Sequence, residues 1–326
     1  MSLPVPLYAL VIEEQRRTTR NGKSFWQNQL KTSVGMIKSN IWDIPDDAET
    51  NLIVPHAKDI IVITSFKDDM AEHQSIAIKD FRRIVKDSLP EEAKGIVEGE
   101  KADPKKLNEA IALIWDNSFW ENPKHHEFVL RCIKKLDVEK LKMCPAASKI
   151  HHRMSGGLLI HTAEVLRLCR AIVESSTEYE FINRDVLYGS SILHDLGKVF
   201  TYSINELGIA TSSLAEKTIG HLFYSVNLIE STYLENKDMV EKWFVEEIMH
   251  CTAAHHGDPE FGSLKKTQSI EAGILAKVDY ISARNGMVDA MLKDNVKSGQ
   301  GLQESFSVYG DQYFASQGMK NYMEKL

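Results

Sequence analysis

The N-terminal part of the chain alternates between apolar and polar positions in short runs. Alternation with a period of two is typical of half-buried strands. Asn21-Gly22 separates the first two runs and marks a tight hairpin turn. The pattern predicts about five short strands, at residues 7–13, 25–32, 36–42, 59–66 and 74–84.

The chain changes to helical spacing after a charged segment. Residues 87–106 contain Pro90 and Pro104 and show no apolar periodicity, which indicates a linker. Residues 107–300 keep steps of three and four between apolar positions, and residues 301–326 form a polar tail. Five strands within residues 1–86 fit a small closed barrel, of which the OB-fold is the commonest kind. We therefore expect a multidomain protein, with a small all-β OB-type barrel followed by an all-α domain.

Composition indicates an ordinary globular protein. The 326 residues are 43% hydrophobic and 26% charged. No leader-like start and no apolar run of membrane-spanning length is present, so we expect a cytoplasmic protein without membrane contact. The four cysteines lack CxxC spacing, which favours buried, reduced thiols.

A net charge of −7 has the wrong sign for coating a phosphate backbone. Contact with nucleic acid then requires a local basic patch or metal ions. Basic residues beside aromatic ones suit single strands, because bases stack on rings while cations hold the backbone. The alternative is a solvated hairpin tip with one of the aromatic rings in the barrel core. The candidate contacts are Arg16, Arg20, Lys23, Phe25, Trp26 and Trp42.

The helical part places metal-ligand residue types on apolar helix faces. His161 falls in the series 158, 161, 165, 168 and 172, whose steps of three and four trace one face. His194 and Asp195 stand at a predicted helix end before Gly197, so both can reach one ion. The remaining candidates on such faces are His221, His255 with His256 beside it, and Asp279.

This ligand set indicates two divalent transition-metal ions. A buried lone carboxylate costs several kcal/mol unless it is paired or ligated. Mixed imidazole and carboxylate ligands suit Mn, which we prefer, or Fe, Co, Ni or Zn. Two ions ~4 Å apart can generate a bound hydroxide and stabilise the charge of an in-line displacement at phosphorus. A single inward histidine is more often a core side chain, but ligand types on five successive helices favour a metal site.

The order His161, His194-Asp195, Asp279 resembles that of HD-domain phosphohydrolases, and the segment HDLGK at 194–198 closely matches their core motif. This resemblance implies an all-helical, metal-binding domain that hydrolyses phosphate esters. His221 and His255 match the subgroups that hold two metals.

A longer stretch resembles the YhaM-type 3′–5′ exoribonucleases, which join an OB domain to an HD domain in this order. It runs from Pro145-Ala146-Ala147-Ser148 through His151-His152 and Gly156-Gly157 to His161-Thr162, and the similarity covers most of residues 5–290. The resemblance implies catalytic roles for Asp195 and Lys198, with Lys198 neutralising the scissile phosphate. It implies metal ligation by His161, His194, Asp195, His221, His255, His256 and Asp279, and substrate contacts by His151, His152 and Gly157.

The resulting prediction is a metal-dependent 3′–5′ exonuclease that hydrolyses single-stranded RNA, with DNA as a second substrate, to nucleoside monophosphates through metal-activated hydroxide. One alternative is a phosphohydrolase of small nucleotides. Against its cyclic-dinucleotide version, Asp258-Pro259-Glu260 stands where such enzymes carry a GYP tripeptide. Another alternative is a nucleic-acid-binding module with a structural HD domain. A homo-oligomer stays open.

Overall fold

The computed structural model forms two compact units, residues 1–99 with 291–326 and residues 100–290, each described here by itself. The residues described are 3–42, 54–69, 75–97, 101–147, 154–175, 177–204, 210–297, 301–308 and 311–325.

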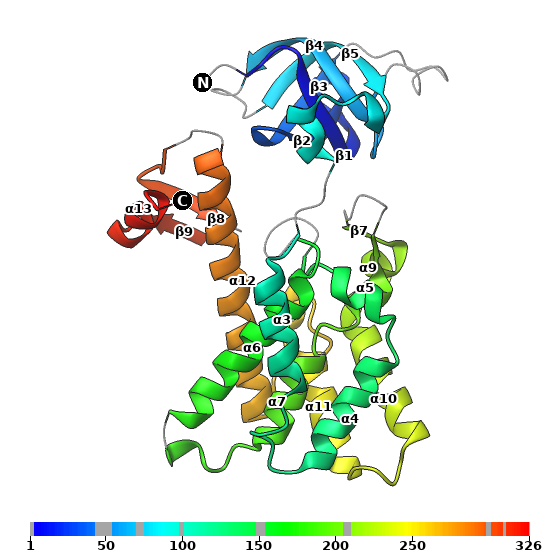
Figure 1. Ribbon diagram of the computed structural model, residues 1–326, viewed down its shortest axis with the longest axis vertical. Coiled ribbons are helices and arrows are strands. Elements are labelled where there is room, and N and C mark those ends of the chain that lie inside the picture. Colours follow the sequence, from blue (N-terminus) through cyan, green and yellow to red (C-terminus); the bar gives the residue numbers. More distant parts are fainter. Residues whose placement is uncertain are drawn as a thin grey trace. The chain divides into compact units, whose positions relative to one another are not determined.

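The N-terminal strands close into a barrel in the order β1-β2-β3-β5-β4 (Figure 1). β3 and β5 pair in parallel, and the other neighbours are antiparallel. The core contains fully buried Val11, Leu30, Ile61 and Ile76. This confirms the predicted OB-type barrel. The strands are β1 (Leu7–Thr18), β2 (Ser24–Thr32), β3 (Gly35–Trp42), β4 (Ile60–Asp69) and β5 (Ser75–Ile84).

β1 is longer than its apolar pattern predicts. The alternation stops at Glu13, yet backbone pairing with β2 continues until Thr18 faces Ser24. Most side chains beyond Glu13 are exposed, so nothing there selects apolar residues while the ladder of hydrogen bonds persists. A register shift between Val11 and Glu13 marks where β1 leaves the core.

The segment predicted as a linker contains two short 3-10 helices, η1 (Lys86–Ser88) and η2 (Glu91–Ile96). η2 contacts β1 and β2, and Ala93 and Ile96 are buried. Two apolar residues among many charges create no detectable period, which is why the sequence showed only a linker.

The second unit is a helical domain (Figure 1). Within it α6 contacts α3 and α7, and α11 contacts α7 and α10. Phe128, Tyr188 and Phe244 are among its largest fully buried side chains. Its main helices are α3 (Pro104–Trp115), α4 (Pro123–Lys134), α5 (Val138–Met143), α6 (Gly157–Glu174), α7 (Arg184–Leu193), α10 (His221–Glu235), α11 (Lys242–Ala254) and, up to residue 290, α12 (Ile270–Lys297).

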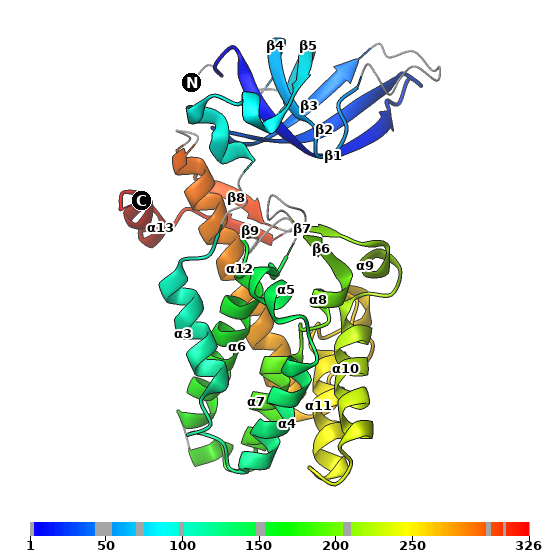
Figure 2. The same ribbon diagram turned by 45° about the vertical axis from the view of Figure 1, so that its right-hand side comes forward.

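Between α7 and α10 the chain makes a small excursion that the helical pattern did not predict (Figure 2). The strands are too short to show an alternation of their own. The excursion consists of α8 (Lys198–Thr201), the hairpin strands β6 (Tyr202–Ile204) and β7 (Ala210–Ser212), and α9 (Leu214–Thr218).

The polar tail also has structure. β8 (Ser305–Val308) and β9 (Asp311–Phe314) form a hairpin, and α13 (Gln317–Met323) follows. Phe306 and Tyr313 stack across the hairpin with ring centroids 5.7 Å apart. Such short, largely exposed elements carry too few apolar positions to be read from periodicity.

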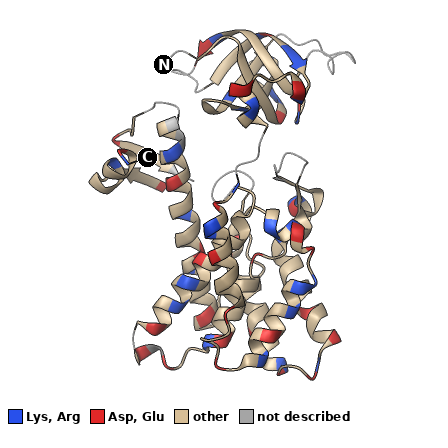
Figure 3. Cartoon of the chain, in the orientation of Figure 1, with Lys and Arg blue, Asp and Glu red and all other residues tan. Residues whose placement is uncertain are grey.

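Lys and Arg positions are interspersed with Asp and Glu along the helices of the second unit (Figure 3). All four cysteines are buried and free, as predicted, and burial raises the pKa of Cys132, Cys144 and Cys251 to about 12. Within the described part of the chain, no helix is long and apolar enough to cross a membrane.

Candidate metal centre and nucleic-acid surface

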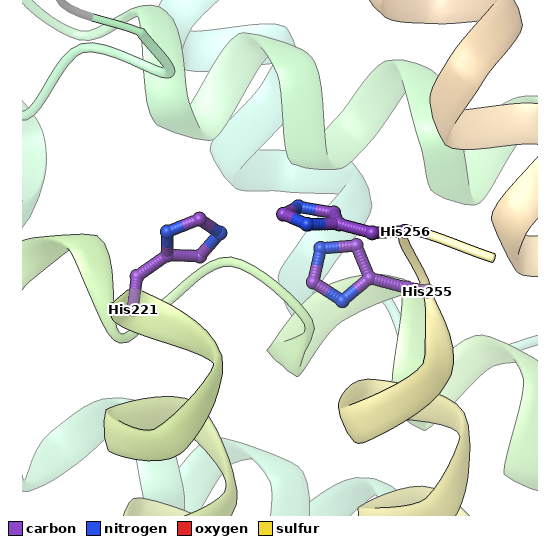
Figure 4. Close-up of side chains that lie close together, drawn as sticks. All are labelled: His221, His255 and His256. Carbon is purple, nitrogen blue, oxygen red and sulfur yellow. The ribbon is translucent and has the colours of Figure 1, made fainter. Parts of the chain in front are cut away.

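Five segments of the helical domain bring the predicted ligands together. They are α6, the end of α7, the start of α10, the end of α11, and α12. Three groups have ligand atoms within 4.8 Å of one another. His161, His194 and Asp279 form the first, and His221, His255 and His256 form the second. The third consists of His194, Asp195 and His255, and so shares a histidine with each of the other two. In Figure 4 the three imidazoles of the second group converge from α10 and α11.

Asp195 lies between the first two groups, and each of its oxygens faces a different one. Oδ1 is 3.2 Å from His221 Nε2 and 3.6 Å from His255 Nε2. Oδ2 is 3.5 Å from His194 Nε2 and 3.6 Å from His161 Nε2. One carboxylate is therefore in position to serve both groups.

Gly197 permits the close packing that brings Asp195 to α10. A Cβ at this position would lie 2.0 Å from the carbonyl oxygen of His221 and 2.7 Å from the backbone nitrogen of Ser225. The Gly197 amide instead donates to Ser225 Oγ at 2.8 Å. The sequence placed a helix end at Gly197, whereas α7 ends at Leu193 and Gly197 is needed for this close approach.

The outer nitrogens of two histidines are fixed by backbone carbonyls. His194 Nδ1 is 2.9 Å from the Ser191 oxygen, and His255 Nδ1 is 2.7 Å from the Thr252 oxygen. Carbonyl oxygens only accept hydrogen bonds, so both Nδ1 atoms must carry the proton. The Nε2 atom of each ring is then the one that points into the centre as a potential ligand.

Side chains fix the outer nitrogens of the other two. His161 Nδ1 is 3.0 Å from Ser282 Oγ, whose own hydroxyl donates to Glu164 Oε2 at 2.9 Å. His221 Nδ1 is 2.9 Å from Glu216 Oε1. Both contacts require a proton on Nδ1, so these rings also direct Nε2 inward.

The atoms that point into the centre are mostly hydrogen-bond acceptors, and a bound cation would stabilise their close approach. His161 Nε2 lies 3.0 Å from Asp279 Oδ1 and 3.3 Å from His194 Nε2; in neutral rings with the proton on Nδ1, both nitrogens are acceptors, as the carboxylate oxygen is. Four further buried atoms make no hydrogen bond to any residue that the structure describes: Asp195 Oδ1, His221 Nε2, His255 Nε2 and His256 Nδ1. Unpaired buried acceptors are costly, so these residues fit a metal centre.

Both carboxylates of the centre are held in the ionised form. Burial alone would raise the pKa of Asp195, but the Lys198 ammonium and His194 hold it well below its usual range. For Asp279 burial is likewise outweighed, chiefly by His161, and its pKa is lowered. The centre thus offers negative oxygens at neutral pH.

The imidazoles divide into two kinds. Burial lowers the pKa of His194 and of His256 to about 3, so both are neutral at pH 7. Burial and the Lys198 ammonium oppose protonation of His221, but the carboxylates of Asp195 and Glu216 prevail and raise its pKa. These two carboxylates therefore favour the charged form of His221.

Three predicted barrel residues come together on the outer face of β2 and β3. Phe25 and Trp42 are cross-strand partners whose rings stack at 4.4 Å and 25°. Lys23 Nζ lies 6.0 Å from the centre of the Trp42 ring. In OB-folds the face formed by strands 2 and 3 binds oligonucleotides.

The other predicted contacts lie elsewhere. Trp26 follows Phe25 along β2, so it points to the opposite side, where it packs against the barrel core with Arg16 as its cross-strand partner. Arg20 is exposed in the β1–β2 turn. Gly157 is buried as the first residue of α6, and His151 and His152 lie outside the described residues.

Comparison with known proteins agrees with this geometry. The family described as "HD domain" matches residues 158–284, which contain both ligand groups. The protein named "3'-5' exoribonuclease YhaM" of Oceanobacillus iheyensis is 31% identical over 92% of this chain and 90% of its own length. The chain belongs to the YhaM family of 3′–5′ exoribonucleases. The YhaM proteins of Bacillus subtilis and a Geobacillus strain are 29% and 28% identical, each over 95% of this chain and over 94% and 91% of their own lengths.

Membership of the YhaM family confirms the resemblance drawn from the sequence and makes this chain an enzyme of the hydrolase class. The HD domain implies that it binds divalent metal. No solved structure matches the chain significantly.

The sequence did not predict the side chains that fix the Nδ1 atoms of His161 and His221. Glu164 and Ser282 each lie three residues after a ligand on the same helix, so helical spacing would have found them. Glu216 lies on α9, a separate short helix beyond the β6–β7 hairpin. No periodic signal connects it to His221.

Proposed function

We propose that this chain hydrolyses single-stranded RNA from the 3′ end and releases nucleoside monophosphates at a centre of two divalent transition-metal ions. One observation carries the proposal: beside the cluster of His161, His194 and Asp279, four buried atoms face the same centre and make no hydrogen bond to any described residue, namely Asp195 Oδ1, His221 Nε2, His255 Nε2 and His256 Nδ1. The names of its YhaM relatives support the RNA substrate and the 3′–5′ direction.

The two ligand groups would each hold one ion. His161, His194 and Asp279 would bind the first, and His221, His255 and His256 the second. Asp195 would contribute one oxygen to each, because its two oxygens face different groups. Mixed nitrogen and oxygen ligands suit manganese, our first choice, and also Fe, Co, Ni or Zn.

When bound, such ions lower the pKa of coordinated water and balance negative charge on a phosphate. The chain itself keeps the centre ready, because Lys198 holds Asp195 in its ionised form. The Lys198 ammonium is also the cation that we assign to the scissile phosphate. Attack by water on phosphorus needs no protein nucleophile.

The barrel would hold the RNA strand that feeds the centre. Phe25 and Trp42 offer a stacked aromatic surface for bases, and Lys23 beside Trp42 offers a charge for phosphate. Neither contact reads a base edge or a 2′-hydroxyl. We therefore infer little sequence preference and include DNA as a second substrate.

The test follows a 5′-labelled single-stranded RNA with purified protein and Mn²⁺, beside a DNA oligomer of the same sequence. We expect products that shorten from the 3′ end, and none with Asp195→Ala. Asp238→Ala removes an exposed aspartate outside the centre and should behave as wild type. Intact RNA despite bound metal would overturn the proposal and favour the alternative, a phosphohydrolase of small nucleotides.

A further inference from the structure

Glu216 makes a contact that no other residue of the centre makes. Its Oε1 accepts the Nδ1 proton of His221 at 2.9 Å, and the Glu216 side chain is largely shielded from solvent. The corresponding acceptors for His194 and His255 are backbone carbonyls, and that for His161 is the Ser282 hydroxyl. Among these four imidazoles, His221 is the one whose outer nitrogen meets a full negative charge directly.

The two ligand groups differ in the negative charge that they contain. His161 and His194 share their group with the carboxylate of Asp279, whereas His221 shares its group with two further imidazoles. Among the residues that the structure describes, the oxygen of Asp195 is the only anionic ligand candidate beside the His221 group. Glu216 supplies a negative charge to that group at one remove, through the His221 ring.

The chain reaches this position by the excursion between α7 and α10. From Lys198 it runs through α8 and the β6–β7 hairpin, and the Ser213 amide then donates to the Thr201 oxygen at 2.9 Å. Ser213 Oγ accepts the Glu216 amide at 3.4 Å and caps α9. The excursion thus fixes the backbone of Glu216 before the chain arrives at His221.

We propose that Glu216 is a positioning residue that orients His221 and sets the metal affinity of the group formed by His221, His255 and His256. This inference rests on the ligand assignment of the proposed function. A carboxylate on the outer nitrogen fixes the ring orientation, keeps the proton on Nδ1 and makes Nε2 a stronger electron donor. Removing the charge of Glu216 should therefore weaken the binding of one metal ion and leave the binding of the other unchanged.

The experiment titrates metal-free protein with Mn²⁺ by calorimetry and, separately, loads it with ¹¹³Cd²⁺ for NMR. The variants are Glu216→Gln, which keeps the shape without the charge, and Glu216→Asp, which keeps the charge with a shorter reach. Glu241→Gln is the matched control. Glu241 also contacts a histidine, with 3.0 Å between its Oε2 and His125 Nε2, but this pair does not belong to the metal centre.

We expect wild type to bind two ions and Glu216→Gln to lose about 10- to 100-fold affinity for one of them. Only one of the two ¹¹³Cd resonances should shift. Glu216→Asp should lie between wild type and Glu216→Gln, and Glu241→Gln should match wild type. Two ions bound by Glu216→Gln with unchanged affinity, or both weakened equally, would overturn the inference and leave the proposed function standing. Wild-type protein that binds no metal would overturn both.

Discussion

The ammonium of Lys198 lies 2.5 Å from Oδ2 of Asp195, three residues earlier in the chain, and both side chains are buried. The contact links the first residue of α8 to the carboxylate between the two ligand groups. A buried ion pair gains most of its value from not leaving one partner alone. The ammonium thus compensates a charge that the metal ions would otherwise have to balance.

Lys198→Met should make stability depend strongly on metal. Without metal, the unpaired Asp195 should lower the free energy of unfolding by about 3–5 kcal/mol. Saturating Mn²⁺ should restore most of this loss, because ions that bind only the folded state stabilise it. Urea unfolding with EDTA and with Mn²⁺ measures both. Lys142→Met, at a surface pair with Glu139, should change stability by less than about 0.5 kcal/mol. An equal loss with and without Mn²⁺ would contradict the interpretation.

Metal content should follow the two ligand groups. We expect two Mn²⁺ per wild-type chain, and one in both His161→Ala and His256→Ala, because each removes a ligand from a different group. Asp195→Ala should weaken both ions. Equilibrium dialysis with elemental analysis gives the numbers. Loss of both ions in either histidine variant, with an unchanged circular dichroism spectrum, would argue against two separate groups.

Gly197→Ala should be strongly destabilising. The added methyl group would meet the backbone of His221 and Ser225, which cannot move aside as a flexible side chain does. We expect a loss of about 3 kcal/mol in the free energy of unfolding and weaker metal binding. Gly273→Ala is the control, since a Cβ there meets nothing within 4 Å and should stabilise α12 by about 0.5–1 kcal/mol. Similar effects of the two changes in urea unfolding would refute the packing argument.

Trp42→Ala should raise KM for RNA and leave kcat unchanged. The loss of one stacking ring costs about 1–3 kcal/mol, which is a rise of about five- to 150-fold. Initial rates over a range of RNA concentrations separate the two constants. Trp115→Ala, which removes a similarly exposed ring from α3, should change neither. A lower kcat with unchanged KM would place Trp42 outside the binding surface.

Stability should fall as pH rises above about 6.5 because of His125. Its Nδ1 is 2.8 Å from Asp185 and its Nε2 is 3.0 Å from Glu241. Burial opposes protonation, but these contacts prevail and raise the pKa of His125 above 6.5. The stabilisation is therefore complete below the unfolded pKa and is lost as pH rises through the folded one.

Urea unfolding of wild type and His125→Gln at pH 5.5 to 9 tests this. The difference between them should shrink by up to about 1.4 kcal/mol per pH unit in that window. At acidic pH, the pH dependence of stability is set by Asp185. Burial alone would raise the pKa of Asp185, but His125 and the backbone amides of Glu121 and Asn122 outweigh it and lower this pKa. A difference that does not change with pH would show that the His125 contacts are not charged.

The sequence predicted best where burial imposes a period. His161 shares its helix face with Leu158 and Val165, so its inward direction could be read directly, and all three are fully buried. The same holds for the alternating part of β1. Beyond Glu13 most side chains are exposed, so the ladder of backbone hydrogen bonds continues without an apolar alternation to reveal it.

The contacts across separate elements could not be predicted. The contact of Glu216 with His221 depends on the turn at Ile219-Gly220 between α9 and α10, and the stacking of Phe25 on Trp42 depends on the register of β2 and β3. Periodicity reports which face of one element is buried. It does not report which residue of another element meets that face.

His161 and Asp279, whose side chains lie 3.0 Å apart in the folded chain, leave the ribosome at very different times. Every other ligand is synthesised between them. The centre therefore cannot assemble until the last of the five segments has emerged.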